Sequence, residues 1–559
     1  MRTIAASLVL LGFACLPQLA RADWPDSGLV VLDPLPSNGA MSVYVKRAPN
    51  GDVVPLVAAR GVSMGYVAQR VLPTGVLAPG WGVAGVFLTN AASSELYHTH
   101  ALVPDDVGGV FHAGFFDPPN PDSVGLQYVQ PGGAVLPYSF GHWRIASGNS
   151  SSTTVDGALD GAGGAYVAWT LSSVRLQRRR ADGTVEPGWS PFGRVVASAG
   201  SFPVVDVESD GAGGAIVLWT NTDGPPHAMR FLSDTTAAPG WSAGGLVLGA
   251  NAPAGGYSSA EMPKLVPSGP DHWIAVWLEP YQTPNRIVAQ RFGRDGTLDP
   301  AWPAAGLVVS GPSDGITATT AMSDGLDGLH VLSLQGGWPN WVHVLASGAF
   351  APGHSVAGVA PQDPGAQLDS PSTSYLVAAP ALDGGLIYLS NDMAGPSIRA
   401  HWLLADGSPD PSEPNARSIP IPTTNGLKAA ISDGAGGVYV LWQKTYDSFT
   451  RKLFMGWLQH ATPVAVAPSA GPAGALALSV PNPNPSRAGF DVRFTLPDGV
   501  PARLELFDLS GRLLRAREVR GAGAGTARFE RMGELRAGVY VVRLSHGSET
   551  RTARVTVLP

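Results

Sequence analysis

Short apolar runs alternate with glycine-rich turns along most of the chain. In "SDGAGGAIVLWT" (Ser209–Thr220), an aspartate and four small residues come before an apolar run that closes on a tryptophan. "LDGAGGAYVAWT" (Leu159–Thr170) and "SDGAGGVYVLWQ" (Ser432–Gln443) repeat the pattern. Because aspartate can bond its own backbone and glycine tolerates positive φ, each stretch predicts a tight turn between two strands.

These stretches belong to a longer repeat. With the last glycine of "DGAGG" as an anchor, the pattern recurs in less similar sequence at an average step of 55 residues. After the anchor come an apolar strand, a second strand that ends in Gln-Arg in several repeats, a run such as "ADGTVEPGW" (Ala181–Trp189), and two further apolar runs. Four short strands per repeat of this length are typical of a β-propeller. The anchors are Asp52, Gly109, Gly164, Gly214, His272, Gly328, Gly385 and Gly437.

The predicted fold class is therefore all-β. We expect residues 23–462 to form a β-propeller of about eight four-stranded blades, closed where Leu29–Val31 meets Leu453–Leu458. Seven blades are the alternative, because the repeats at Asp52 and Gly109 are loosely spelled. Large aromatic side chains stabilise mainly by burial, so the tryptophans five residues past the anchors are expected in the blade core. They are Trp169, Trp219, Trp277 and Trp442.

A calcium loop is the other interpretation of "DGAGG". Calcium takes several oxygen ligands, typically from aspartates at alternate positions. Here one carboxylate stands among glycine and alanine, and the repeats at Asp52, His272 and Gly385 lack it. We therefore predict structural turns, with no metal and no other cofactor.

One part of the repeat resembles a known type. "IVAQRF" (Ile287–Phe292) ahead of "RDGTLDPAWPAAGLVV" (Arg294–Val309) is similar to the delta-60 type of repeat in bacterial surface proteins. This chain has tryptophan where that pattern usually has phenylalanine.

The first 22 residues have the pattern of a secretory signal peptide. An early arginine precedes an apolar run, and a small-x-small site predicts cleavage between Ala22 and Asp23. The single cysteine, Cys15, lies inside this segment, so the mature chain is expected to contain none; a lipoprotein anchored at Cys15 is the alternative. No later segment is apolar over the roughly 20 residues that a membrane-spanning helix needs, so no transmembrane segment is predicted.

The C-terminal part has a different pattern. Residues 463–480 are rich in Ala, Pro and Gly and are expected to be a linker. Residues 481–559 then alternate cleanly: in "FDVRFTL" (Phe490–Leu496), phenylalanine, valine and leucine share one face and polar residues share the other. Six short antiparallel strands of this kind predict a small immunoglobulin-like β-sandwich.

The sequence motifs of this domain are more specific than its predicted fold. "PNPNPS" (Pro481–Ser486), "LFDLSGRLLR" (Leu506–Arg515), "LRAGVYVVRL" (Leu535–Leu544) and a terminal "TARVTVLP" occur in this order. Together they resemble the type A sorting domain of type IX secretion substrates, close to the FlgD-type immunoglobulin-like family. A structural sandwich with no role in targeting is the alternative. The residues that carry the resemblance are Pro481, Asn482, Pro483, Asp508, Gly511, Arg512, Gly538, Tyr540 and Arg543.

The resemblance implies a route and a partner. The chain would cross the periplasm, engage the type IX secretion machinery, and end at the outer-membrane surface or in the medium. The formal net charge of −7 is unevenly spread, since residues 481–559 carry 13 Arg and no Lys against 8 acidic residues. Neither part has a basic stripe, so nucleic acid is not an expected partner.

Catalytic motifs are weak in this sequence, and no catalytic residue is predicted. The nucleophile-elbow motif G-x-S-x-G occurs at Gly61–Gly65 and Gly311–Gly315, but a nucleophile elbow requires a turn from a strand into a helix. The two histidines of His98–His100 lack a readable third metal ligand. The favoured function is therefore non-catalytic binding of an extracellular glycan or protein, with Trp338 and Trp341 as candidate contacts unless they pack on a neighbouring blade. The alternative is a secreted propeller-fold hydrolase or lyase acting on polysaccharide, with carboxylates gathered from several blades.

Overall fold

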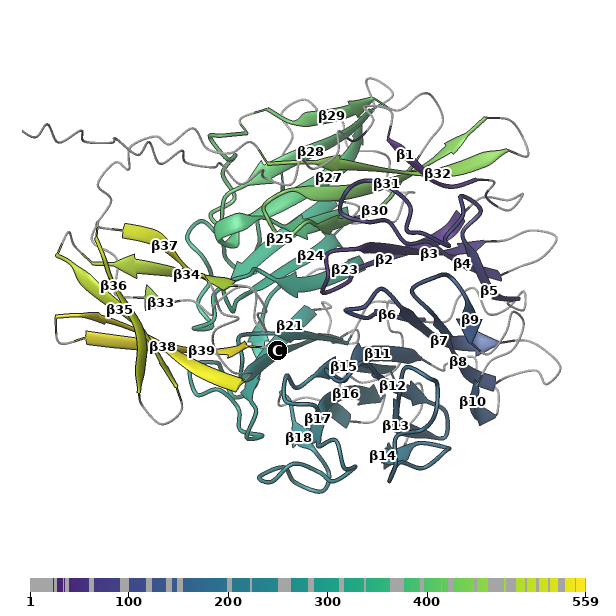
Figure 1. Cartoon of the computed structure of the whole chain (residues 1–559), viewed down its shortest axis with the longest axis horizontal. Helices are drawn as coiled ribbons and strands as arrows, with labels where there is room; N and C mark the ends of the chain where they lie inside the picture. The colour runs from purple at the N-terminus through teal and green to yellow at the C-terminus, as the bar shows by residue number, and fades with distance from the viewer. Residues whose placement is uncertain are drawn as a thin grey trace, which may run out of the picture. The chain divides into compact units, whose positions relative to one another are not determined.

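The structure is a computed structural model of the whole chain (Figure 1). It separates into two compact units, Met1–Ala461 and Thr462–Pro559, which are described here one at a time. The residues described are 24, 28–33, 35, 40–59, 65–90, 100–116, 123–136, 143–147, 154–198, 204–221, 224–249, 263–279, 286–310, 316–335, 338–361, 377–392, 397–413, 415–420, 426–446, 450–460, 477–478, 489–497, 500–508, 512–520, 523–530, 538–547 and 549–557.

The described part of the first unit forms eight antiparallel sheets. Six have four strands, one has five and one has three, and a single 3-10 turn, Leu382–Gly384, is the helical exception among them. In chain order the strands are β1 Leu29–Leu32; β2 Ala40–Arg47, β3 Val53–Ala59, β4 Gly65–Ala68, β5 Val86–Asn90; β6 Ala101–Pro104, β7 Val110–Phe116, β8 Ser123–Val129, β9 Val135–Leu136, β10 Trp143–Ser147; β11 Val155–Leu159, β12 Ala165–Thr170, β13 Ser173–Arg179, β14 Arg194–Ser198; β15 Val204–Ser209, β16 Ala215–Asn221, β17 Gly224–Phe231, β18 Leu246–Val247; β19 Lys264–Pro267, β20 His272–Glu279, β21 Arg286–Gly293, β22 Leu307–Val308; β23 Ile316–Ser323, β24 Leu329–Gln335, β25 Trp338–Val344; β26 Val377–Pro380, β27 Leu386–Asp392, β28 Ser397–Leu403, β29 Arg417–Pro420; β30 Gly426–Ser432, β31 Val438–Thr445 and β32 Arg451–Leu458.

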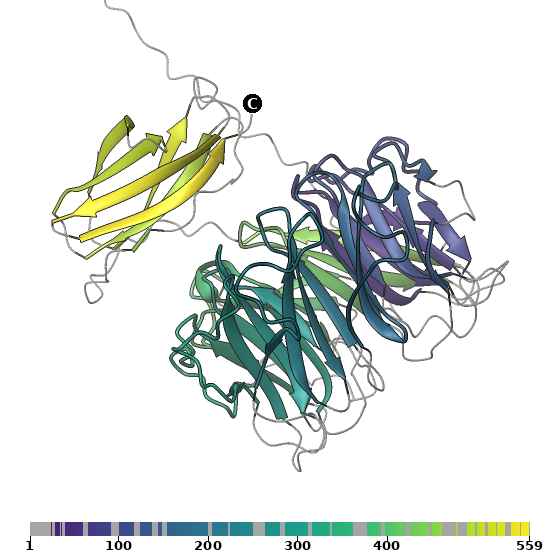
Figure 2. The same cartoon turned by 90° about the horizontal axis from the view of Figure 1, so that it is seen from below.

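The eight sheets follow one another in a propeller-like ring. The inner strand of each sheet contacts the inner strand of the next, in the order β2, β6, β11, β15, β19, β23, β26 and β30, and β30 returns to β2. The N-terminal strand β1 completes the last sheet by pairing with β32, where Leu29 lies opposite Met455. The predicted pairing of the two ends is therefore confirmed. Figure 2 shows the purple N-terminal strands beside the light green strands of the last sheet.

All eight predicted anchors lie at the same turn, between the inner strand and the second strand of a sheet. In each turn the N–H of the residue four positions before the anchor donates to the anchor carbonyl. Since these turns recur once in each sheet, the repeat found in the sequence corresponds to the sheets of the structure. The donor and acceptor residues are Ala48–Asp52, Asp105–Gly109, Asp160–Gly164, Asp210–Gly214, Ser268–His272, Asp324–Gly328, Ala381–Gly385 and Asp433–Gly437.

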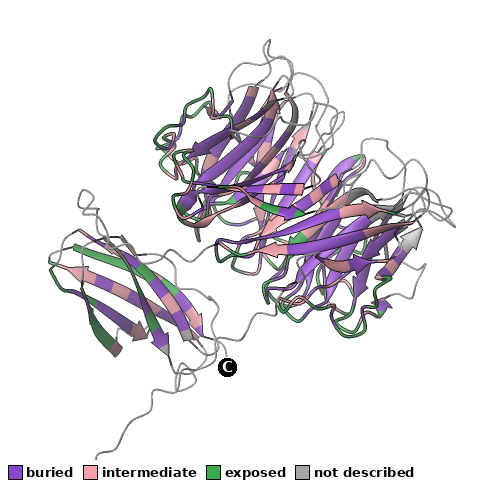
Figure 3. Ribbon diagram, turned by 90° about the horizontal axis from the view of Figure 1, so that it is seen from above, coloured by how far each residue is buried: buried purple, intermediate pink, exposed green. Residues whose placement is uncertain are grey.

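The strand-end tryptophans are buried, as predicted, with Trp169 at 0% and Trp219 at 3% exposure. Figure 3 shows that most of the strand residues in the first unit are buried. Each needs a glycine beside it. Gly193, just before β14, has φ +72°, and a Cβ there would lie 2.3 Å from Trp169 Cη2. Gly28 has the same relation to Trp442, at 2.4 Å. This contact explains why a glycine opens the outer strand in these sheets.

The second unit is a sandwich of two sheets. The described strands are β33 Ala477–Leu478, β34 Gly489–Leu496, β35 Ala502–Asp508, β36 Leu513–Val519, β37 Gly523–Glu530, β38 Gly538–His546 and β39 Glu549–Val557. β33, β34 and β37 form one sheet, and β36, β35, β38 and β39 form the other. Phe490, Val492, Phe494 and Leu496 all lie in the core between them, as the alternation predicts.

One prediction about this unit needs correction. Six strands were expected, and the described residues form seven. The extra strand, β33, lies inside the predicted linker and pairs Leu478 with Phe494. Leu478 packs on the core of the sandwich, so burial of this side chain outweighs the linker-like composition around it. Among the described residues, no helix is long and apolar enough to cross a bilayer.

Candidate functional site

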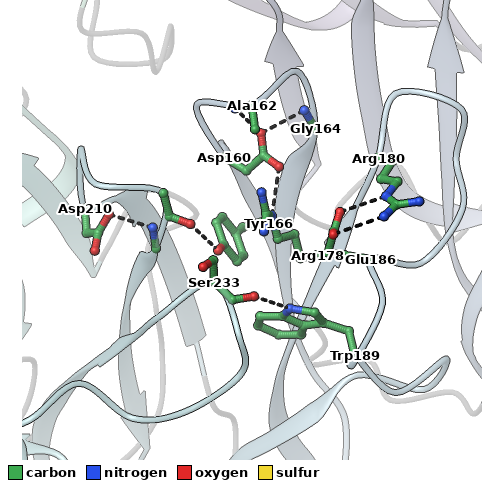
Figure 4. A network of polar contacts seen from close by, with 12 residues as sticks. Asp160, Ala162, Gly164, Tyr166, Arg178, Arg180, Glu186, Trp189, Asp210 and Ser233 are labelled. Atoms are coloured by element: carbon green, nitrogen blue, oxygen red, sulfur yellow. Dashed lines mark hydrogen bonds and ion pairs between the residues drawn. The ribbon is translucent and has the colours of Figure 1, made fainter. Parts of the chain in front are cut away.

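The turn aspartates are bonded on both carboxylate oxygens. Asp160 Oδ1 accepts hydrogen bonds from the N–H groups of Ala162 and Gly164 at 2.7 and 2.8 Å. Its Oδ2 accepts one from Arg178 Nε, on the third strand, at 2.8 Å (Figure 4). Asp210 makes the same set of bonds with its own turn and with Arg230. A carboxylate held this way stabilises a hairpin.

The donor to this carboxylate changes from sheet to sheet. Asp105 receives a bond from the Tyr128 hydroxyl, Asp324 is bonded to His343, and Asp433 receives one from the Trp457 indole. Where the aspartate is missing, other residues take over: Asp52 at the anchor itself pairs with Arg70, and the Ser268 hydroxyl accepts from Arg291. No group of three or more His, Cys, Asp and Glu residues suited to a metal occurs in the described part of the chain. These bonds assign the aspartates to the turns.

A second set of tryptophans ties neighbouring sheets together. Trp189 closes "ADGTVEPGW", and its indole N–H donates to the carbonyl of Ser233 in the next sheet at 2.9 Å (Figure 4). Trp81, Trp241 and Trp302 make the same type of bond to the sheets that follow them. The "PGW" part of the repeat is therefore a link between sheets.

The structure places the predicted ligand-contacting tryptophans as follows. Trp341 is fully buried, and its indole N–H donates to His330 Nδ1 at 3.2 Å. This places it in the core instead of on a binding surface, because its burial in an aromatic cluster offers no face to a ligand. The side chain of Trp338 lies outside the described residues, as do Gly61–Met64, residues 311–315, His98 and Thr99. His100 is described, and its Nε2 lies 2.6 Å from the Tyr66 hydroxyl.

Trp341 belongs to a buried histidine cluster beside the 3-10 turn. His343 Nε2 lies 3.0 Å from Asp324 Oδ2, and its Nδ1 lies 2.9 Å from the carbonyl of Ala405. The ring of His343 therefore connects the anchor turn at Asp324 to the chain at Ala405. His343 thus occupies the position that Arg178 and Arg230 hold in other sheets. Burial lowers the pKa of His330 to about 3 and that of His354 to about 4, which keeps both neutral.

A second buried cluster lies on the inner strands and was not predicted. Asp156 on β11, Asp206 and Glu208 on β15, and Lys264 on β19 come from three consecutive sheets. Lys264 Nζ lies 2.7 Å from Asp206 Oδ1. Asp206 is nearly inaccessible, whereas the Lys264 side chain keeps 29% of its surface exposed. The signal in the sequence was faint: a carboxylate at an otherwise apolar position in "FPVVDVES".

Each aspartate of this cluster also bonds to the backbone of the following sheet. Asp156 Oδ2 accepts from the N–H of Val207 at 2.9 Å, and Asp206 Oδ2 accepts from the N–H of Leu265 at 2.6 Å. The inner strands are therefore joined by side chains in place of a ladder of backbone bonds. The main structural role of the two carboxylates is therefore to connect neighbouring sheets.

The electrostatics of the cluster are unbalanced, with three carboxyl groups around one ammonium. Burial raises the pKa of Asp206, Lys264 opposes this, and the negative charge of the neighbouring Asp156 adds to it. Burial also raises the pKa of Glu208. Burial lowers the pKa of Lys264, but Asp206, Asp156 and Glu208 outweigh it and raise that pKa overall. The cluster therefore holds its ammonium firmly and tends to retain a proton on Asp206 or Glu208.

The described residues of the sorting motif fall into two structural roles. Asp508 and Arg512 close the turn between β35 and β36: the Arg512 N–H donates to Asp508 Oδ1 at 3.0 Å, and the Asp508 N–H donates to the Arg512 carbonyl at 3.1 Å. These two bonds match those between Asp160 and Gly164 in the repeats. Gly538 begins β38, and Tyr540 lies in the core. Pro481, Asn482, Pro483 and Gly511 lie outside the described residues, as does the predicted cleavage site at Ala22 and Asp23.

Arg543 lies on the face of the sandwich that points away from its core. Its guanidinium donates to Glu505 Oε2 at 2.8 Å and lies over the Phe507 ring, 4.3 Å from the centroid. Arg503 Nε lies 2.9 Å from the other oxygen of the same carboxylate. Glu505 thus fixes two arginines on one surface of the domain.

Comparison with known proteins agrees with this organisation. Residues 482–558 match the family model of the secretion system C-terminal sorting domain. No curated protein matches the sequence.

The solved structures that resemble the chain do so loosely. The BP39L lectin from Burkholderia pseudomallei has 12% identity and a TM-score of 0.39, over 65% of this chain and 96% of the lectin. The SapL1 lectin has 12% identity and a TM-score of 0.30, over 56% and 96%. Prolyl oligopeptidase B from Galerina marginata has 8% identity and a TM-score of 0.38, over 73% and 55%. At these TM-scores the likeness indicates no ligand and no reaction. The family match is specific by contrast: the chain carries a secretion system C-terminal sorting domain over residues 482–558.

Proposed function

We propose that this protein is an exported binding protein, in which an eight-bladed β-propeller recognises an extracellular glycan or protein without transforming it. An immunoglobulin-like sorting domain would direct it through the type IX machinery to the cell surface or the medium. The observation that carries export is the family match at residues 482–558. The secretory signal at residues 1–22 is part of the same proposal.

The eight-bladed form of the proposal rests on repetition and closure. Eight sheets carry the same inner turn, their inner strands contact one another in a ring, and β1 completes the sheet of β30 to β32. Radial repetition of sheets leaves only short, protected sheet edges, which limits edge-to-edge aggregation. Such a rigid scaffold suits recognition by its surface.

The non-catalytic part of the proposal rests on how the polar side chains are used. The turn aspartates are bonded to their own turns and to third-strand donors, and Asp156 and Asp206 are bonded to backbone N–H groups of the next sheet. A general acid or base must reach the ligand on which it acts, so carboxylates committed to turns and to contacts between sheets are poorly placed to transform an external ligand.

A polysaccharide hydrolase or lyase is the second candidate. One observation favours it: Asp156, Asp206 and Glu208 place three carboxyl groups on neighbouring inner strands, and burial raises the pKa of Asp206 and of Glu208. Glycosidases use a pair of carboxyl groups, and the general acid is the one whose pKa is raised.

Binding and turnover can be separated with the mature full-length protein. We expect it to retain a ligand on a glycan array or in a pull-down of surface proteins, and to release no reducing ends from a panel of polysaccharides. Turnover that is lost in Asp156→Asn would establish the enzyme instead. Asp182→Asn is the matched control, because Asp182 is an exposed turn carboxylate bonded to Thr184. Retention in the periplasm of a strain with the type IX machinery would contradict the export part.

A further inference from the structure

Lys264 and Asp206 bring together an amine and a carboxyl group, the two groups needed to form an amide bond. We propose that the two side chains condense in the folded protein, so that Lys264 Nζ becomes bonded to Asp206 Cγ. The product is an isopeptide cross-link between β19 and β15, two neighbouring sheets. This inference does not depend on which ligand the protein binds.

The nucleophile and the electrophile are already in contact. Nζ lies 2.7 Å from Asp206 Oδ1, so it is close to the carbon that it would attack. Both residues are held by strands of different sheets whose inner strands pack together. Fixing two reacting groups at contact distance replaces a bimolecular encounter, and this proximity accounts for much of the acceleration in intramolecular acyl transfer. The Asp206 side chain is 7% exposed, which limits competition from water.

Two neighbouring groups supply the remaining chemistry. The N–H of Leu265 donates to Asp206 Oδ2 at 2.6 Å, where negative charge would develop in the tetrahedral intermediate. The Asp156 carboxyl group is an electrostatic neighbour of both Asp206 and Lys264 and is itself positioned by the N–H of Val207. We assign to Asp156 the transfer of a proton from the Lys264 ammonium to the departing Oδ1.

The step is balanced without a co-reactant. An ammonium and a carboxylate become one amide and one water: the new bond is Nζ–Cγ, the broken bond is Cγ–Oδ1, and two of the three ammonium protons leave with that oxygen. Nothing is oxidised or reduced. The ammonium is the resting form, so the reaction is expected to be slow. It needs to occur only once in the life of each molecule.

The cross-link would join positions 58 residues apart in the chain. Closing a loop of that size restricts the unfolded chain, as a disulfide does. The mature chain is expected to contain no cysteine, so a disulfide could not perform this role.

The test is the mass of the purified mature protein. We expect an intact mass one water below that of the sequence. After trypsin, residues 195–230 should remain joined to residues 231–286, because Lys264 is no longer a cleavage site. Lys452 is the internal control: its Nζ lies 2.6 Å from Asp33 Oδ2, but the Asp33 side chain is 31% exposed, against 7% for Asp206, so this pair should stay unlinked and cleavable.

Two variants identify the reacting groups. Lys264→Arg keeps the positive charge and removes the amine, so the full mass should return. Asp156→Asn removes the proton carrier, so linked material should form at least tenfold more slowly. The proposal is overturned if the wild-type protein keeps its full mass and is cut after Lys264 following days at neutral pH, or if Lys264→Arg still lacks one water. The wild-type measurement decides alone if a variant does not fold.

Discussion

Arg230 bonds to Asp210 across two strands, with its Nη2 2.8 Å from the aspartate Oδ2. The Asp210 side chain is fully buried, and its other oxygen holds the N–H groups of Ala212 and Gly214. One residue therefore fixes both the turn before the second strand and the position of the third strand.

Asp210→Ala is expected to lower the free energy of unfolding by about 3 kcal/mol or more, since removing one partner of a buried pair leaves the other charge uncompensated. Asp182→Ala is the control, because Asp182 is exposed and holds only Thr184; it should cost about 1 kcal/mol or less. Thermal and urea unfolding of the mature protein measure both. Equal losses would show that burial of the pair is unimportant.

Gly193→Ala tests the contact between the outer strand and the core tryptophan. The new Cβ would meet Trp169 Cη2 at 2.3 Å, and the φ of +72° adds strain, so we expect a loss of about 2–4 kcal/mol. Gly213→Ala has a similar φ, +88°, with open space around the Cβ, and should cost about 1 kcal/mol. The difference between the two melting temperatures isolates the clash. Equal losses in melting temperature would show that the positive φ alone destabilises both variants and that the clash with Trp169 is unimportant.

Acid should destabilise the protein through its buried histidines. Burial lowers the pKa of His330 to about 3 and that of His354 to about 4, below the ordinary value of 6.5. The unfolded chain therefore binds protons first as the pH falls. Stability is complete above about pH 6.5 and is lost progressively below it, by up to tenfold in the unfolding constant per pH unit and per histidine.

His354→Leu keeps an apolar side chain in the cluster and removes one titrating group. Between pH 7 and pH 5, this variant should lose less stability than the wild-type protein, whatever its stability at pH 7. Chemical denaturation at the two pH values measures the difference. Parallel losses would assign the acid sensitivity to other groups, such as His112, whose pKa burial lowers to about 3.

Removing residues 462–559 should leave a folded first unit in the periplasm. The two units have separate cores, and the cut falls before β33, which belongs to the sandwich. We expect normal amounts of the truncated protein in the periplasmic fraction and at least a tenfold loss from the surface and medium. Undiminished export would contradict the role of the sorting domain, and loss of the protein from all fractions would contradict independent folding.

The sequence determined the repeating parts of this protein. The anchor turns, the buried tryptophans such as Trp169, and the alternating strand at Phe490 were all predictable. Each depends on local backbone bonds or on the two-residue period of a β-strand. Residues only a few positions apart in the chain determine both. The pairing of Asp160 with Arg178 was also accessible, since Asp210 and Arg230 have nearly the same spacing.

Only the tertiary structure decided what lies between the sheets. Nothing in the spacing of Asp156, Asp206 and Lys264 shows that they meet, because their contact depends on how three consecutive inner strands are placed side by side. Trp341 likewise looked suitable for a ligand, and its burial beside His330 follows from the packing of β24 and β25. Local spacing specifies a turn or a strand, whereas the register between sheets is set by the packing of side chains that are distant in the chain.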